Sequence, residues 1–254
     1  MDKATMELPR TPSFRLDGRR AVVTGAGRGI GLAATAALAN AGADVTLLAR
    51  TANEIEAAAL AMGGTAVVLD VSDIAGVAEF FAAQPAFHIL VNNAGTNRPK
   101  PMTEVNEDDY DAVFDLNVKS AFFVAQAAVR RMLAERIPGS LIHIGSQMGH
   151  VGGPNRSLYC GSKWALEGMS KAFALDLAKH NIRSNVIAPT FIETPLTKPF
   201  FDDPAFKASV LEKIKLGRIG QVEDLMGAIL FLASDASALM TGSSMIIDGG
   251  WTAD

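Results

Sequence analysis

The chain has 254 residues, which is enough for one α/β domain of ordinary size with a sizeable core. Its residues are 49% hydrophobic and 20% charged, a balance typical of a folded enzyme and not of a disordered or fibrous chain. A net charge of -4 with dispersed basic residues argues against nucleic acid as a partner, and the single Cys160 excludes an intramolecular disulfide and a multi-cysteine metal site.

The N-terminal segment carries acidic residues and prolines and has no apolar core of signal-peptide length. We expect residues 1–15 to form a flexible tail and residues 16–254 to form one folded domain. No run of about 20 apolar residues occurs, so we expect no membrane span. Together with the lone cysteine, this favours a cytoplasmic protein.

A glycine-rich turn follows the first apolar run, residues 20–24. The turn contains Gly25, Gly29 and Gly31 and leads into an alanine-rich helical pattern at residues 32–40. Glycines let the backbone come close to a ligand, and the free N–H groups at a helix start bind a pyrophosphate. The order of strand, glycine turn and helix therefore predicts a dinucleotide site.

The residue after the second predicted strand, 45–49, bears on the choice of cofactor. In NAD-binding units an acid at this place binds the ribose hydroxyls. Here the place holds Arg50, which, with Arg28 of the glycine turn, offers positive charge to a 2′-phosphate. We expect NADP(H) as the cofactor, with NAD(H) as the alternative.

Apolar runs continue to alternate with helical patterns along the chain. Strands are expected at residues 65–69 and 87–91, with a helix at 73–83 between them. Further strands are expected at 141–145, 186–188 and 244–247, and a helix at 221–233. This alternation predicts an α/β fold, a single-domain Rossmann-type doubly wound parallel sheet flanked by helices, whose ligands bind at the carboxyl ends of the strands.

Tyr159 and Lys163 lie four residues apart, a spacing that places both side chains on one face of a helix. A nearby lysine favours the phenolate and lowers the pKa of a tyrosine from its reference of about 10. Such a phenol is suited to general acid/base chemistry near neutral pH. We interpret the pair as a candidate reaction centre.

Five motifs in the same order resemble the compact form of the short-chain dehydrogenase/reductase family, and the resemblance runs from about Leu16 to the C-terminus. They are Thr24-Gly25-x-x-x-Gly29-x-Gly31, Asp70-Val71, Asn92-Asn93-Ala94-Gly95, Ser146 thirteen positions before Tyr159, and Tyr159 with Lys163. The chain has Pro189-Thr190 where the family usually has Pro-Gly, a departure that costs backbone freedom beside the cofactor.

The resemblance implies a hydride transfer between a nicotinamide cofactor and a carbonyl or secondary alcohol. It implies that Tyr159 donates the proton, Ser146 holds the substrate oxygen, and Lys163 lowers the tyrosine pKa and binds the nicotinamide ribose. Asn117 is expected at a helix kink, where it holds a water of a proton relay. The implied cofactor-binding residues are Gly25, Arg28, Gly29, Ile30, Gly31, Arg50, Asp70, Val71, Asn92, Ala94, Gly95, Tyr159, Lys163, Pro189, Ile192 and Thr194.

The substrate is expected to be a small polar molecule. Arg98 offers a partner for a carboxylate, and Gln147, His150 and Asn155 are expected to line the site, which suggests a sugar acid or polyol. Residues 190–217 form a long aromatic-bearing excursion that we interpret as a substrate lid. The resemblance also implies a homotetramer, and no metal is expected.

Two alternatives stay open from the sequence. The stretch Ile192-Glu193-Thr194 also resembles the 3-oxoacyl-[acyl-carrier-protein] reductases, in which arginines hold the acidic carrier. Arg130 and Arg131 are candidates for that task, but Leu175 stands where a second arginine is expected. From another class, a non-catalytic NADP-sensing regulatory protein would keep the fold, although the retained Asn117, Ser146, Tyr159 and Lys163 argue against it.

Overall fold

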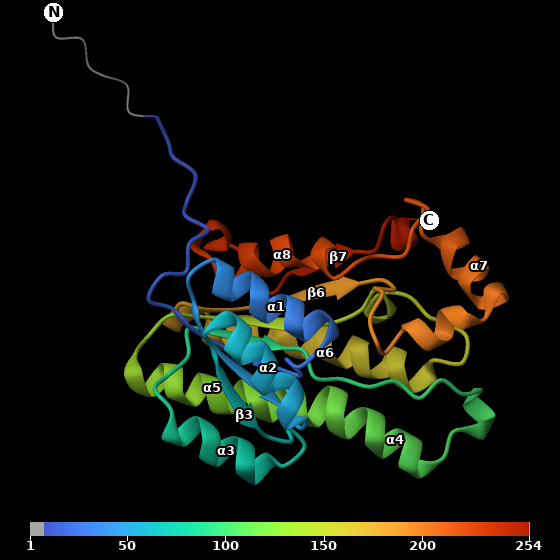
Figure 1. Cartoon of the computed structure of the whole chain (residues 1–254), viewed down its shortest axis with the longest axis horizontal. Helices are drawn as coiled ribbons and strands as arrows, with labels where there is room; N and C mark the ends of the chain where they lie inside the picture. Colours follow the sequence, from blue (N-terminus) through green and yellow to red (C-terminus); the bar gives the residue numbers. More distant parts are fainter. Residues whose placement is uncertain (1–7, 254) are drawn as a thin grey trace, which may run out of the picture.

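The computed structural model describes residues 8–253 and contains one seven-stranded sheet (Figure 1). All neighbouring strands are parallel, in the order β3-β2-β1-β4-β5-β6-β7. The strands are β1 (Arg20–Thr24), β2 (Asp44–Ala49), β3 (Thr65–Val68), β4 (Ile89–Asn92), β5 (Gly139–Ile144), β6 (Ile182–Pro189) and β7 (Ser244–Ile247). The order reverses direction beside β1, which confirms the predicted doubly wound sheet and places a switch point between β1 and β4.

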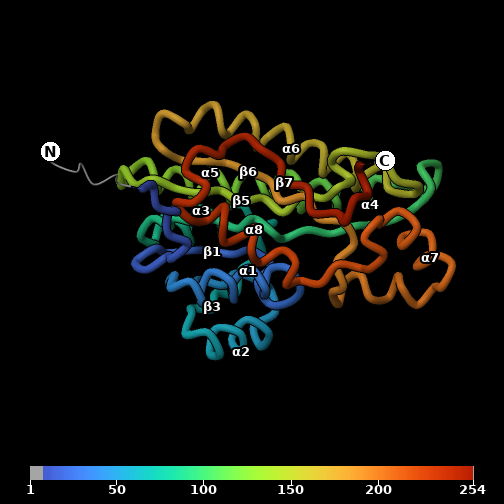
Figure 2. Tube along the Cα trace, turned by 90° about the horizontal axis from the view of Figure 1, so that it is seen from above, coloured from blue at the N-terminus to red at the C-terminus, as the bar shows by residue number. Residues whose placement is uncertain are grey.

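Helices cover both faces of the sheet, as Figure 2 shows from above. The longer helices are α1 (Gly29–Asn40), α2 (Ala52–Met62), α3 (Ile74–Ala83), α4 (Glu107–Phe114), α5 (Ala121–Glu135), α6 (Ser157–Leu177), α7 (Pro204–Lys213) and α8 (Glu223–Ala233). Helices α1, α2 and α8 enclose one hydrophobic core with the sheet, and α3 and α5 enclose a second core on the other face. Short 3-10 turns lie at Met102–Glu104, Gln147–Gly149, Ala178–His180, Lys198–Asp202, Asp235–Ser237 and Trp251–Ala253.

The central strands are apolar because both of their faces are buried. Ala21, Val22 and Val23 of β1 are fully buried, and so are Leu90 and Val91 of β4. Such continuous apolar runs are expected of parallel strands under helices on both faces. At about 25 cal/mol per Å² of buried apolar surface, these strands supply much of the stabilisation that holds the carboxyl ends in place.

Helices α4 and α5 are joined by a π-helical turn, Asp115–Ser120, into one helical run from Glu107 to Glu135. By length and composition this run is apolar enough to cross a membrane, which differs from the expectation that no such run occurs. In the fold, Val124, Ala128 and Met132 of α5 are buried against the sheet and α3. The run is therefore a covering helix of the second core.

The region predicted as a lid, residues 190–217, leaves the sheet after β6 and contains the 3-10 turn Lys198–Asp202 and helix α7. Figure 1 places α7 near the C-terminus, beyond the end of the sheet. Residues 1–7 of the predicted tail lie outside the described residues, and Phe14 contacts Phe231 of α8 at a ring-centroid distance of 6.4 Å. The tail is thus docked on the domain by its last residues.

Candidate active site

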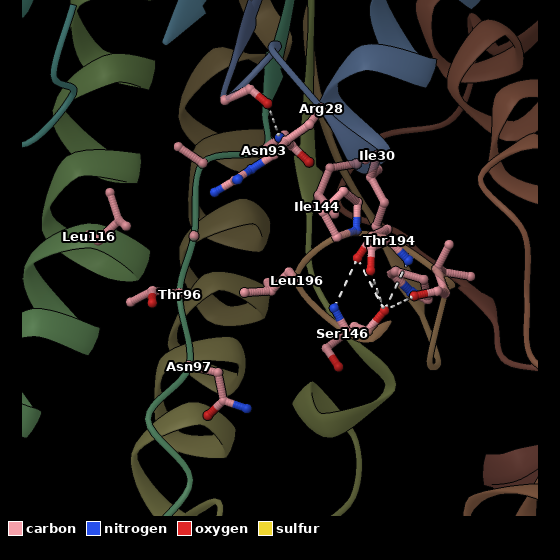
Figure 3. A pocket seen from close by; sticks show the side chains of 18 of the residues that line it. Arg28, Ile30, Asn93, Thr96, Asn97, Leu116, Ile144, Ser146, Thr194 and Leu196 are labelled. Carbon is pink, nitrogen blue, oxygen red and sulfur yellow. Dashed lines mark hydrogen bonds between the residues drawn. The ribbon is translucent and has the colours of Figure 1, made fainter. Parts of the chain in front are cut away.

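A cavity of about 330 Å³, within the range of small-molecule sites, lies along the carboxyl ends of the parallel strands. Its lining comes from the turn after β1, the ends of β2, β3 and β4, the segment after β5, the start of α6 and the segment after β6. Figure 3 shows Arg28 and Asn93 toward one end of this cavity and Asn97 and Ser146 toward the other. The cavity thus joins the predicted cofactor motif to the predicted reaction centre.

The glycine turn lies against the neighbouring backbone. A Cβ atom on Gly31 would lie 2.1 Å from the carbonyl oxygen of Gly25, so no other residue fits without a shift of the turn. Gly31 itself does not line the cavity, whereas Gly25, Gly29 and Ile30 do. Helix α1 begins here with no side-chain cap, so its first N–H groups are left for an anion.

Two arginines lie at the end of the cavity beside the glycine turn, which we call the cofactor end. Each of them is near an acid. Arg28 Nη1 lies 3.9 Å from Glu54 Oε1, and Arg50 Nη1 lies 3.6 Å from Asp70 Oδ2. The arginine side chains are 66% and 73% exposed, so these ion pairs are weak. Burial works to raise the pKa of Asp70, but hydrogen bonds from Ser72 and the charge of Arg50 outweigh it, so this pKa lies below its usual value.

The Asn92-Asn93 motif places the second asparagine, and not the first, toward the cavity. Asn93 lines it and donates from Nδ2 to the carbonyl oxygens of Thr24 and Gly25, at 2.9 and 3.1 Å. Asn92 was predicted to bind the cofactor, but its buried side chain donates to the carbonyl oxygen of Ala121, at 2.7 Å. Successive side chains of a strand point to opposite faces, which is why one residue of the pair turns away.

The segment after β6 closes the cavity from the other side. Pro189, Thr190, Ile192 and Thr194 all line it, and a Cβ atom on Gly29 would lie 3.3 Å from the Thr194 side chain. Thr190 stands where the family usually has glycine, yet its φ is not positive, so the backbone accommodates the side chain. The Thr190 Oγ1 atom is buried without a hydrogen-bond partner among the described residues and faces a site that can supply one.

Tyr159 and Lys163 both lie on α6, which begins at Ser157, and both line the cavity. Lys163 is buried, and its ammonium group donates to the carbonyl oxygen of Ile144 at 2.8 Å. The ammonium nitrogen lies 5.6 Å from the centre of the Tyr159 ring. The predicted juxtaposition of a phenol and an ammonium group on one helix face is confirmed.

The predicted lowering of the tyrosine pKa is not found. Burial raises the pKa of the Tyr159 phenol, and a hydrogen bond with Ser146 and the charge of Arg156 only partly oppose this. Burial also lowers the pKa of Lys163 to about 8, against the raising effect of Glu167. Desolvation is the largest cause of both shifts, and the Lys163 ammonium group directs its hydrogen bond to Ile144.

Ser146 lies at the carboxyl end of β5 and lines the cavity beside Tyr159. Its hydroxyl donates to Gln147 Oε1 at 2.7 Å and accepts the Met148 N–H at 3.1 Å. Gln147 also lines the cavity, as predicted for a substrate-binding residue. The Ser146 proton is therefore directed to Gln147 in this structure, and its role toward a substrate oxygen stays a prediction.

Asn117 lies in the π-helical turn, which provides the predicted distortion of the helix. Its side chain is used inside the protein: Oδ1 accepts the Thr96 N–H at 2.8 Å, and Nδ2 donates to Thr96 O and to Ser162 Oγ. Asn117 does not line the cavity. It fixes the segment after β4 to α6, and its role in a proton relay stays a prediction.

Three of the four predicted substrate residues lie outside the cavity lining. Arg98 pairs with Asp109 of α4 at 3.3 Å, and His150 bonds Glu167 and Ser244 at 3.1 and 3.0 Å. Asn155 has a positive φ of 59°, and its carbonyl oxygen accepts the Lys100 N–H. These three residues therefore make contacts within the fold and do not face the cavity as predicted.

The lining also contains residues that were absent from the predicted set. Asn93 is one, and its motif was recognised although the wrong member was chosen. Arg156 is another: it lies directly before α6, three residues before Tyr159, and makes no side-chain cap hydrogen bond to the helix. Asn97, by contrast, belongs to the loop that the sequence offered as a substrate lining together with Arg98; it lines the cavity, and its Oδ1 atom is buried without a hydrogen-bond partner among the described residues.

Comparison with known proteins gives relatives that cover nearly the whole chain. Residues 25–252 match the sequence profile of a family described as enoyl-(acyl carrier protein) reductase. The chain is 37% identical to D-erythrulose reductase of Gallus gallus and 36% identical to gluconate 5-dehydrogenase of Gluconobacter oxydans. Each alignment covers 94% of this chain, with 98% and 96% of the respective relatives.

Solved structures agree with this grouping. A gluconate 5-dehydrogenase from Burkholderia cenocepacia, in complex with NADP and tartrate, superposes with a TM-score of 0.90 at 38% identity. The match covers 95% of this chain and 98% of that one. With the parallel sheet, the glycine turn and the Ser146, Tyr159 and Lys163 cluster, these matches show that the chain belongs to the short-chain dehydrogenase/reductase family of oxidoreductases.

Proposed function

We propose that the chain is an NADP(H)-dependent oxidoreductase that interconverts a small polar keto compound, of the sugar, sugar-acid or polyol type, and its secondary alcohol. The observation that carries the proposal is that Ser146, Tyr159 and Lys163 line the same cavity as the glycine turn and its arginines. A nicotinamide cofactor bound along this cavity would supply the hydride, and Tyr159 would supply the proton, to one substrate carbonyl.

The residues of the cavity fit a nicotinamide dinucleotide. The uncapped start of α1 suits the pyrophosphate, and Arg28 and Arg50 suit a 2′-phosphate. The buried, unpartnered Thr190 Oγ1 and the nearby Thr194 suit the polar carboxamide end. When bound, the cofactor supplies or accepts the hydride.

The chain's own residues hold the substrate and move the proton. Ser146 would turn its hydroxyl from Gln147 to the carbonyl oxygen, and Tyr159 would give its proton to the same oxygen as the carbon gains the hydride. The product is the alcohol, and oxidation reverses both transfers. Because burial keeps the Tyr159 pKa high, the phenol is protonated at neutral pH and ready for reduction.

Polar groups favour a hydroxylated substrate at the end of the cavity beside Ser146 and Tyr159, which we call the reaction end. Gln147 and Asn97 line the cavity there, and the Asn97 Oδ1 atom, which has no partner among the described residues, is an acceptor for a substrate hydroxyl. The relatives named above are reductases or dehydrogenases of erythrulose and gluconate, which are polyhydroxylated compounds. An apolar ketone would leave these buried polar groups without partners.

The test is a substrate panel with NADPH and with NADH. It contains 5-keto-D-gluconate, D-fructose, L-xylulose, cyclohexanone and an acetoacetyl group on an acyl carrier, with the corresponding alcohols in reverse. We expect NADPH oxidation with the polyhydroxylated ketones and little with cyclohexanone. Exclusive use of the carrier-bound substrate would replace the proposal by the acyl-carrier reductase, and tight NADPH binding without turnover would support a sensor.

A carrier-docking role finds little support at Arg131, whereas Arg130 is exposed on α5 and stays a candidate. Arg131 bonds Glu135 and the carbonyl oxygen of Gln84, and the exposed Leu175 offers no charge. The homotetramer, the cytoplasmic location and the closure of residues 190–217 over the substrate stay predictions. Pro195, Leu196 and Phe200 of that segment line the cavity, which supports the lid.

A further inference from the structure

Arg156 has an unusual setting at the reaction end of the cavity. Its guanidinium carbon lies 5.5 Å from the centre of the Phe191 ring, 5.6 Å from that of Phe200 and 6.0 Å from that of Phe206. The three rings come from the segment after β6, the 3-10 turn Lys198–Asp202 and helix α7. The arginine directly before α6 is therefore surrounded by aromatic rings of the segment 190–217.

This guanidinium has no acidic partner among the described residues, unlike the other arginines near the site. Arg28 and Arg50 lie near Glu54 and Asp70, and Arg98 pairs with Asp109. No hydrogen bond or ion pair joins a described residue to the Arg156 guanidinium. Burial lowers the pKa of Arg156 against the raising effects of Tyr159 and Cys160, which means that its charge has lost part of its hydration.

The surroundings of Arg156 favour an anion inside the cavity. Arg156 lines the cavity with Tyr159, one helical turn further along α6. The only acids in the lining, Glu54 and Asp70, lie at the cofactor end, so no acid of the lining competes near Tyr159. The three rings contact the guanidinium without accepting its N–H groups in conventional hydrogen bonds, and a planar carboxylate can bind such N–H donors with two hydrogen bonds.

We propose that Arg156 binds the carboxylate of the substrate and makes the enzyme selective for a keto acid over a neutral ketose. This assignment rests on the proposed function and narrows it from polar keto compounds to keto acids of the sugar type. It also moves the expected carboxylate partner from Arg98, which lies outside the cavity, to Arg156. The three phenylalanines hold the guanidinium in place while its edge meets the substrate.

The test compares two six-carbon substrates that differ in charge, 5-keto-D-gluconate and D-fructose, by kcat/KM with NADPH. We expect Arg156→Met to lower kcat/KM for 5-keto-D-gluconate by about 10- to 100-fold, the range of a hydrogen bond to a charged group, chiefly through KM. The value for D-fructose should change less than about threefold. Methionine keeps an unbranched apolar side chain for the phenylalanine rings.

Three further variants separate the possible roles. Arg156→Lys, which keeps the charge without the planar fork, should lose less of the preference than Arg156→Met. Arg98→Met decides between the two arginines and should leave the preference as it is. Arg130→Met, on the exposed face of α5, is the surface control.

Several outcomes would overturn the proposal. Equal losses for both substrates in Arg156→Met would make Arg156 a tether of the lid and not a carboxylate partner. A preference lost in Arg98→Met and kept in Arg156→Met would return the role to Arg98. Wild-type enzyme that reduces D-fructose as well as the keto acid would refute the inference and leave the proposed function standing, whereas failure with every polar ketone would refute the proposed function itself.

Discussion

The two ends of the cavity bind charge in different ways. At the cofactor end, Arg28 and Arg50 are more than half exposed and lie near acids, so solvent screens each interaction. At the reaction end, Lys163, Ser146 and Gln147 are buried, and Arg156 lies among aromatic rings with no acidic partner in residues 8–253. The contrast teaches that solvent weakens each charge–charge interaction at the first end. At the second end, the loss of hydration determines the pKa values of the buried groups.

The largest effect is expected at the reaction end, from Tyr159→Phe. The variant lacks the proton donor, so kcat for reduction should fall by about 10²- to 10⁴-fold. The Kd for NADPH, measured by fluorescence titration, should change little because the phenylalanine ring keeps its place. A variant with near wild-type kcat would show that another group supplies the proton.

The second expected effect is on the pH dependence of the free energy of unfolding. His143 of β5 is fully buried, and neither of its ring nitrogens has a hydrogen-bond partner in the described part of the chain. Burial, followed by the charge of Lys163, lowers the pKa of His143 to about 4. The unfolded chain binds a proton near pH 6.5, so this neutral histidine contributes stability above that pH, and the contribution is lost as pH falls toward 4. The full loss is about 3 kcal/mol.

We therefore expect His143→Leu to be as stable as the wild type or more stable at pH 7, and to lose less stability than the wild type between pH 6.5 and 4. Urea unfolding at a series of pH values measures this difference. His180→Gln, at an exposed position, serves as the control and should keep the wild-type slope. An unchanged pH dependence in His143→Leu would show that His143 is not held neutral by the fold.

The smallest effect is expected at the exposed cofactor end, from Arg50→Ala. Loss of one screened charge should raise KM for NADPH by about threefold to tenfold and leave KM for NADH nearly unchanged. Steady-state kinetics with both cofactors at a saturating keto substrate measures the change. Equal changes for NADPH and NADH would make Arg50 a bystander and weaken the assignment of NADP(H).

Much of the fold could be predicted from the sequence because parallel strands under two helical layers are continuous apolar runs. The strands at Arg20–Thr24 and Ser244–Ile247 have the predicted bounds. Helix α2 was not predicted, since it buries only Ile55 and Ala59 and has a weak apolar pattern. Strand β6 begins at Ile182, before the predicted start at residue 186. Its first half was missed because buried polar residues such as Ser184 and Asn185 interrupt the apolar pattern.

The site was predictable where neighbours in sequence are neighbours in space. The glycine turn and the Tyr159-Lys163 pair are of this kind. Which arginine faces the cavity was not predictable, because Arg98 is held by Asp109 of α4, and Arg156 by rings from a segment that begins more than 30 residues later. The pKa of Tyr159 also depends on burial, which the spacing of two residues does not contain.

The central claim, hydride transfer to a polar keto substrate beside Tyr159, is tested most directly with NADPH that carries deuterium at both positions of C4 of the nicotinamide. Mass spectrometry of the product formed from 5-keto-D-gluconate should show one deuterium on the new alcohol carbon with the wild-type enzyme and a greatly reduced yield with Tyr159→Phe. Unlabelled product, or equal labelled product from Tyr159→Phe, would contradict the account.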